Sequence, residues 1–381
     1  MRGVGRALAA LSGTLTAIFV AAPAHADSVR GHEWFLPTLN VTHAHRYSTG
    51  TGIVVAIIDT GVDATHPDLL GRVLRGIDLS DPTNPDGKGT GWDDQDGHGT
   101  AIAGVIAGHG HGPSRSDGIL GIAPGAKILP IRNGVGASLD EESAVTGVYW
   151  AINHGASVIC LAEAGPVDDP DLSSAIEAAE SKDIVVVAGA GNTPAQGLQY
   201  PAAYPGVLAV GGTDQHGKHA AISVVQNYIS IAAPATDIYS TYLNHGYASG
   251  DGTSAATAIV AGAAALVRSR FPHLSAAEVI HRLTATATDE GPPGRDDEYG
   301  YGELNLVAAL TANVPPLRSS PSPSSADTPA PSSDPATSIP PLAQVADASG
   351  GVPYLPVAVG VIGVLLVLGV WLVLRRKARS P

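Results

Sequence analysis

Three short stretches, far apart in the chain, each carry one side chain that can do acid–base or nucleophilic chemistry. Asp59 ends an apolar run and precedes Thr-Gly, His98 precedes Gly-Thr, and Ser254 follows Gly-Thr. A serine hydroxyl is a weak nucleophile unless a neighbouring base removes its proton, and a carboxylate can orient a histidine for that task. If the fold brings the three together, they predict a serine nucleophile activated by His98, with Asp59 behind it.

The residues after Ser254 tell where its hydroxyl would lie. Small residues continue at helical spacing to Arg270, and Phe271 and Pro272 end the run. Ser254 is therefore predicted in the first turn of a buried helix, where backbone N–H groups lack partners and the helix dipole favours negative charge. Such a position suits an oxyanion. By itself the Gly-Thr-Ser turn would equally fit a tight turn before a core helix, but the Asp59 and His98 motifs favour the catalytic interpretation.

The elements that must position these residues follow an alternating pattern. The run Ile53–Ile58 before Asp59 is apolar and β-branched, as in strands that are buried on both faces. Strands alternating with helices predict an α/β fold with a doubly wound, mostly parallel sheet. Further strands are predicted at 128–131, 158–161, 184–187 and 207–210, and helices at about 101–107, 141–154, 172–181 and 275–285.

Asp-Thr-Gly, His-Gly-Thr and Gly-Thr-Ser in this order resemble the motifs of the subtilisin-like serine proteases, over about residues 50–311. The resemblance implies a subtilisin-like α/β/α fold. It implies that Ser254 attacks a peptide carbonyl, that His98 transfers the proton and that Asp59 fixes the His98 tautomer. Asn192, in Ala-Gly-Asn, matches the family's oxyanion asparagine and would hold the oxyanion together with the Ser254 N–H.

The segment that should bind substrate departs from the family. The family usually reads Ser-Leu-Gly-Gly there, and its backbone pairs with the substrate as an added strand. The resemblance makes Ala162, Glu163 and Ala164 the substrate-binding positions, with a hydroxyl lost, a charge gained and a Cβ added. Glu163 either points away or faces a subsite, where it would favour basic substrate side chains. Burial alone is the less favoured alternative, because an unpaired carboxylate is costly in a core.

The two ends of the chain predict export and a membrane anchor. Arg2 and Arg6 precede an apolar stretch that ends in Ala-His-Ala, which is typical of a cleaved secretory signal. About 20 apolar residues near the C-terminus can span a bilayer, and the arginines after them should stay cytoplasmic. The predicted order is a signal peptide at 1–26, an extension at 27–48, the peptidase domain at 49–312, a Pro/Ser-rich linker at 313–353, a transmembrane helix at 354–374 and a basic cytoplasmic tail at 375–381.

The composition and the predicted order of segments limit which partners the protein is expected to have. A net charge of -14 argues against nucleic-acid binding, and the single cysteine, Cys160, excludes an internal disulfide. The signal, spacer and single C-terminal span resemble the mycosins, membrane-anchored proteases of type VII secretion, although mycosins commonly carry disulfides. The expected partners are a protein or peptide substrate, the cell membrane and components of a secretion complex. No cofactor is expected; calcium at Asp93, Asp94 and Asp96 is possible in principle, but exposed acidic loops are commoner.

Two other functions stay open. The altered segment at Ala162–Ala164 would also fit a catalytically weak scaffold that stabilises a secretion complex. A general degradative protease is the second alternative, and cleavage of unrelated unfolded proteins would distinguish it.

Overall fold

The structure is a computed structural model, and it describes residues 29–81, 83, 87–134, 140–194 and 197–317. The predicted signal peptide, transmembrane helix, basic tail and most of the linker lie outside these residues. Within the described ranges, no helix combines the length and apolarity that a membrane crossing requires.

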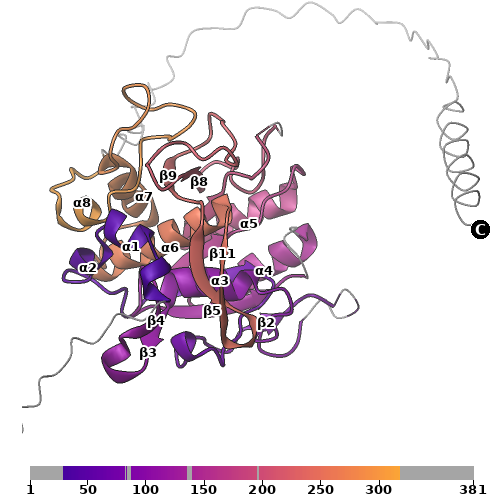
Figure 1. Ribbon diagram of the computed structural model, residues 1–381. Coiled ribbons are helices and arrows are strands. Elements are labelled where there is room, and N and C mark those ends of the chain that lie inside the picture. Colours follow the sequence, from indigo (N-terminus) through magenta and orange to yellow (C-terminus); the bar gives the residue numbers. More distant parts are fainter. Residues whose placement is uncertain (1–28, 82, 84–86, 135–139, 195–196, 318–381) are drawn as a thin grey trace, which may run out of the picture. The chain divides into compact units, whose positions relative to one another are not determined.

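The central sheet has seven strands, and every neighbouring pair in it is parallel. Four of these strands, β2, β5, β8 and β9, are labelled in Figure 1. The chain enters the sheet at β1, the third strand in this order, and later adds β5 on one side and β6 on the other, which confirms the predicted parallel sheet. At such a switch point the two connections leave in opposite directions and open a crevice at the carboxyl ends of the strands. The strand order is β2 (Ile77–Asp78), β5 (Lys127–Arg132), β1 (Val54–Asp59), β6 (Val158–Leu161), β7 (Val185–Gly189), β8 (Leu208–Thr213) and β9 (Ile231–Pro234).

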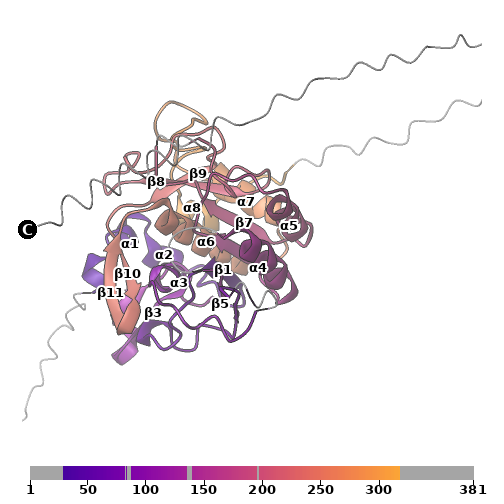
Figure 2. The same cartoon turned by 90° about the vertical axis from the view of Figure 1, so that its right-hand side faces the viewer.

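Helices cover both faces of the sheet (Figure 2). Along β1, Val55 and Ile57 belong to one buried cluster, and Ala56 and Ile58 to another, as the period of two in a strand requires. The first cluster contains α3 (His98–Ala107), α6 (Thr253–Arg270), α7 (Ala276–Ala285) and α8 (Leu306–Thr311), and the second contains α4 (Glu141–Asn153) and α5 (Pro170–Ser181).

Two antiparallel ribbons and several short helical turns complete the described fold. The ribbon of β10 and β11 packs beside α3 and reaches the edge of the crevice. Their bounds are β3 (His109–His111) with β4 (Asp117–Leu120), β10 (Ile238–Tyr242) with β11 (Gly246–Gly250), α1 (Phe35–Thr38), α2 (Val41–Ala44), and the 3-10 turns Arg30–His32, Pro67–Leu69, Pro113–Arg115 and Leu243–His245.

Most sequence-predicted elements lie within three residues of their observed positions. Helix α7 begins with the capping box that Ser275 and Glu278 predict: each side chain bonds to the other residue's backbone N–H. Helix α3 begins at His98, three residues before the predicted start. The sequence indicated neither the β10–β11 ribbon nor the helical turns of the N-terminal segment.

The described part of the N-terminal extension is built into the peptidase core. Phe35 is 0% exposed, and Val41 and Ala44 are buried in the same cluster as α3 and α6. The Trp34 indole N–H donates to the carbonyls of Thr236 and Asp237 at 3.0 and 3.1 Å. Residues 29–48 therefore share one hydrophobic core with the domain that the sequence analysis began at residue 49.

We predict that Phe35→Ala lowers the free energy of unfolding by about 3–5 kcal/mol, because it leaves a cavity in that core. Urea denaturation monitored by circular dichroism measures the effect. The control is Leu70→Ala, at a side chain that is 57% exposed, which should cost less than about 0.5 kcal/mol. Equal, small losses in both variants would mean that the segment is only peripheral to the fold.

Candidate active site

Strand β1 delivers a buried carboxylate to the crevice. Asp59 is its last residue, and both carboxylate oxygens accept from Nδ1 of His98, at 2.8 and 2.9 Å. The backbone N–H of Thr60 donates to the same carboxylate at 2.8 Å. Because Nδ1 carries the shared proton, Nε2 is left as the basic nitrogen on the opposite side of the ring.

One half-buried acid in the loop before α3, Asp94, holds the start of that helix, and with it His98. Asp94 Oδ2 accepts from the N–H and hydroxyl of Thr100 at 2.9 and 2.6 Å, and Oδ1 accepts from the Thr60 hydroxyl at 2.9 Å. Oδ1 also accepts from the Gly97 N–H at 2.8 Å. These bonds tie the end of β1 to the first turn of α3, so they set the distance between Asp59 and His98.

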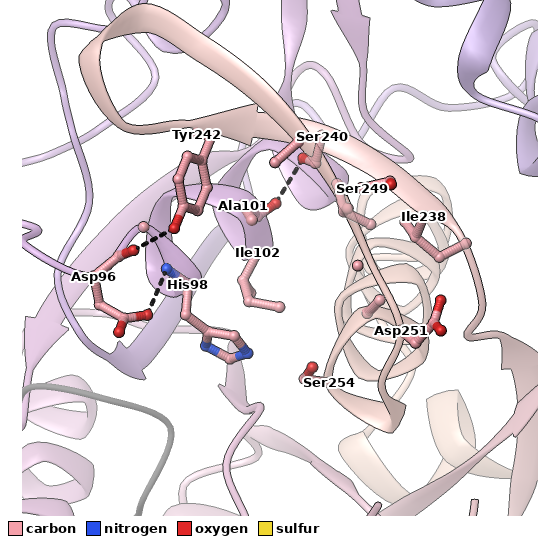
Figure 3. A pocket seen from close by; sticks show the side chains of 15 residues that line it. Asp96, His98, Ala101, Ile102, Ile238, Ser240, Tyr242, Ser249, Asp251 and Ser254 are labelled. Atoms are coloured by element: carbon pink, nitrogen blue, oxygen red, sulfur yellow. Dashed lines mark hydrogen bonds between the residues drawn. The ribbon is translucent and has the colours of Figure 1, made fainter. Parts of the chain in front are cut away.

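Gly97 gives the turn before His98 its shape. Its φ is +99°, a left-handed conformation that glycine adopts readily, and an added Cβ would come within 2.3 Å of the Tyr242 ring. The Tyr242 hydroxyl donates to the Asp96 carbonyl at 2.9 Å (Figure 3). The β10–β11 ribbon thus braces the loop that carries His98.

Ser254 is the second residue of α6, in the first helical turn, as predicted. Its hydroxyl and the His98 ring face each other at the mouth of a cavity of about 200 Å³ (Figure 3). The cavity runs between α3 and the β10–β11 ribbon, and its wall is mainly apolar. The apolar lining includes Ala101, Ile102, Val105, Ile238 and Ala255.

Asn192 lies beside Ser254 with a defined orientation. Its Oδ1 accepts from the backbone N–H and the hydroxyl of Thr253 at 2.7 and 3.0 Å. No described residue is bonded to Nδ2, the other end of the amide. A Cβ added at Gly252 would lie 2.8 Å from Ser254 Oγ and 3.4 Å from Asn192 Nδ2, so the hydroxyl and the amide nitrogen lie near the same point. An oxygen atom held between them could accept from Nδ2 and from a backbone N–H in the first turn of α6.

The predicted substrate positions follow β6, and one of them requires a correction. Ala162 is buried and Ala164 is half-buried, but Glu163 is only 3% exposed. Ligand atoms of Glu163, Asp59 and His98 all lie within 4.8 Å of one another. The carboxylate thus turns inward to the Asp59–His98 pair. The structure therefore has the burial that the sequence analysis disfavoured. The Glu163 carboxylate does not present its charge to a basic substrate side chain.

Burial of the Glu163 carboxyl group costs less free energy when the group is protonated than when it is ionised. Burial and the nearby Asp59 charge raise the pKa of Glu163 to about 8, against the opposing effects of the Asn133 amide and of His98. Asn133 Nδ2 donates to Oε2 at 3.2 Å. For His98, burial lowers the pKa, but the charge and hydrogen bonds of Asp59, with the charges of Glu163 and Asp96, raise it to about 9.

Asp59, His98 and Glu163 also have the spacing of a metal site within the described ranges. His98 Nδ1, however, already donates to Asp59, so a metal bound through that nitrogen would have to displace the hydrogen bond. In the acidic loop, Asp94 is saturated by protein donors and Asp93 pairs with Arg132 at 3.1 Å. Cys160 is fully buried, and burial raises the pKa of its thiol. The expectation about cofactors stays a prediction.

Sequence reasoning missed four side chains that support the site: Asp94, Thr253, Asn133 and Tyr242. The acidic run around Asp94 looked like an exposed loop, and a threonine in a glycine-rich turn carries no distinctive signal. Asn133 comes directly after β5, so its place at the carboxyl edge of the sheet was the one available clue.

A buried Asp–His pair facing a serine at a helix N-terminus, at the switch point of a parallel sheet, defines an α/β serine hydrolase. Residues 50–302 match the Subtilase family, and the chain belongs to that family of serine proteases. It is 38% identical to a thermostable alkaline protease of Halalkalibacterium halodurans, over 72% of this chain and 73% of that protein. Mycosin-1 of Mycobacterium tuberculosis is 35% identical, over 74% of each chain.

Solved structures of mycosins share the fold. A MycP1 structure, described as an essential component of the type VII (ESX-1) secretion system, superposes with a TM-score of 0.65 at 34% identity, covering 76% of this chain and 90% of that one. MycP3 from the ESX-3 system gives a TM-score of 0.62 at 32% identity, covering 74% and 88%. These neighbours support a place for this serine protease in the mycosin group.

We predict that Asp94→Ala lowers the free energy of unfolding by about 3 kcal/mol, because it leaves several donors around the start of α3 without an acceptor. Denaturant unfolding measures it. The control is Asp93→Ala: this side chain is 67% exposed, and its ion pair should contribute about 0–1 kcal/mol. If the two variants lose the same stability, Asp94 does not organise the loop.

Proposed function

We propose that this protein is a membrane-anchored, extracytoplasmic serine endopeptidase associated with type VII secretion, with Asp59, His98 and Ser254 as its catalytic triad. The observation that carries the proposal is the doubly hydrogen-bonded Asp59–His98 pair, whose ring faces the Ser254 hydroxyl at the start of α6. Asn192 is the fourth catalytic residue, because its Nδ2 lies near the same point as the Ser254 hydroxyl.

The reaction uses these groups in two halves. Ser254 Oγ attacks the peptide carbonyl while Nε2 of His98 takes its proton, and Asp59 stabilises the resulting imidazolium. The carbonyl oxygen becomes an oxyanion that accepts from Asn192 Nδ2 and the Ser254 N–H. His98 then gives the proton to the leaving amine, which leaves an ester on Ser254. Water hydrolyses the ester by the same proton transfers, and the serine is restored.

Substrate orientation follows from the two sides of the Ser254–His98 pair. On one side the residues after β6, Ala162–Ala164, offer backbone for an added strand, as the family resemblance implies. On the other side lies the apolar cavity between α3 and the ribbon. We assign the acyl part of the substrate to the Ala162–Ala164 backbone and the leaving part to the cavity, where an apolar side chain after the scissile bond fits.

The secretion and membrane assignments rest on the relatives and on the chain ends. Mycosin-1 and the MycP structures match this chain over about three quarters of its length. The signal-like start and the apolar segment followed by Arg375 and Arg376 support one span with a cytoplasmic C-terminus. A protein substrate and secretion-complex components are the partners that this assignment implies.

A weakly catalytic scaffold is a second candidate, and one observation favours it. Glu163 lies against the Asp59–His98 pair, where it affects the proton affinity of the base. Complementation separates the two: a scaffold would restore secretion in a deletion strain even as Ser254→Ala, and a required protease would not.

We predict that a fluorophosphonate probe labels the wild-type chain, that Ser254→Ala abolishes labelling and that His98→Ala reduces it strongly, because the hydroxyl then lacks its base. In-gel fluorescence measures the label. Ser249→Ala is the matched control, since Ser249 lines the same cavity and should be dispensable for labelling. Undiminished labelling of Ser254→Ala would contradict the assignment of Ser254 as the nucleophile.

For topology, we predict that protease added to intact cells digests the domain of residues 49–312, while a tag after Pro381 stays protected. The basic residues after Leu374 hold that end in the cytoplasm. Immunoblotting of the two regions measures this, and detergent-lysed cells, in which both are digested, are the control. A protected domain with a digested tag would contradict the proposed orientation.

A further inference from the structure

We infer that Glu163 is a positioning residue that restrains the catalytic base: once ionised, its carboxylate stabilises the protonated form of His98 and moves the release of Nε2 to higher pH. This inference deepens the proposed function and rests on it, since it concerns the residue that serves as base in the Ser254 reaction.

Three ionisable groups lie close together, two of them buried and one half-buried. A carboxylate oxygen of Glu163, one of Asp59 and a ring nitrogen of His98 all lie within 4.8 Å of one another. Glu163 is 3% exposed, and its Oε1 is buried without a hydrogen-bond partner among the described residues. With little water to screen them, charges at this separation interact far more strongly than on a surface.

The groups that face Glu163 come from each element packed around it. Asp59 ends β1, His98 begins α3, Asp96 lies in the loop before α3, and Asn133 follows β5. Asp59 and Asp96 disfavour a negative charge on Glu163, the Asn133 amide favours it, and the His98 imidazolium favours it. Among these four groups, His98 alone can carry the positive charge that an ionised Glu163 requires.

The order in which Glu163 and His98 lose their protons explains how Glu163 restrains the base. With the pKa of Glu163 raised to about 8 and that of His98 to about 9, both groups mostly hold a proton at neutral pH, and only a small fraction of His98 is free to accept one from Ser254. If Glu163 loses its proton first, the new carboxylate stabilises the imidazolium, and the base is still blocked. Only loss of the His98 proton frees Nε2. Two groups this close titrate as a pair, so Glu163 moves the availability of the base to higher pH.

The direction in which a substitution of Glu163 should change the pKa of His98 follows from this order. Glutamine has the size of glutamate but no charge, so in Glu163→Gln nothing at this position stabilises the imidazolium. The pKa of His98 should fall, and the acid limb of the kcat/KM profile should move to lower pH. A shift of one pH unit corresponds to about a tenfold gain in rate below the midpoint.

The first test needs no turnover. The Ser254→Ala chain, full length in detergent micelles with carbon-13-labelled histidine and EDTA, is titrated by NMR with and without Glu163→Gln. The His98 resonance is identified by its loss in His98→Gln, because the chain has 14 histidines. We expect the His98 midpoint to fall in Glu163→Gln. An unchanged or higher midpoint overturns the inference, whether or not Ser254 proves to be the nucleophile.

The second test measures the base in action, as the rate of fluorophosphonate labelling against pH in wild type and Glu163→Gln. Glu142→Gln, at an exposed glutamate, is the matched control and should keep the wild-type profile. A purely structural role for Glu163 would lower the rate at every pH without moving the acid limb, and that result refutes the restraint. If circular dichroism shows that Glu163→Gln does not fold, Glu163→Leu, also neutral, replaces it in both tests with the same expected shift.

Discussion

The contact between Asp59 and His98 is the interaction on which the rest of this site depends. It joins the end of β1 to the first turn of α3, and it gives the fully buried Asp59 carboxylate a hydrogen-bond donor. A buried charge is stable only where hydrogen bonds and an opposite charge compensate it. The switch point of the sheet supplies the space, and Asp94 and Gly97 supply the turn that brings His98 to it.

The electrostatic character of the site follows from that arrangement. The charges of three acids, Asp59, Asp96 and Glu163, each raise the pKa of His98. The imidazole therefore binds its proton more tightly than it would beside Asp59 alone. In the family pattern, leucine is common at the position of Glu163, where it would be electrostatically silent. One side chain after β6 therefore contributes to the proton balance of the site.

The parts of the structure that could be predicted from the sequence are the regularly alternating strands and helices and the residues in short motifs. The buried parallel strands were predictable because runs such as Ile53–Ile58 are apolar on both faces, and the motifs around Asp59, His98 and Ser254 pointed to side chains that the structure brings together. The inward turn of Glu163 was not predictable, because strand alternation allows either face and only tertiary packing selects one. The role of Asp94 was hidden for a similar reason: its bonding partners Thr60 and Thr100 are on different elements, and an acidic loop gives no sign of them.

The N-terminal segment has a consequence for the order in which the chain can fold. Trp34 donates to a carbonyl 202 residues further along, and α2 packs against α8, which begins at Leu306. The first described residues therefore find their native partners only after almost the whole domain has been synthesised. Contacts between such distant residues carry a high loop-closure cost and form late. Until they form, Phe35 and its apolar neighbours stay exposed, so the growing chain presents apolar surface to its surroundings until helix α8 is complete.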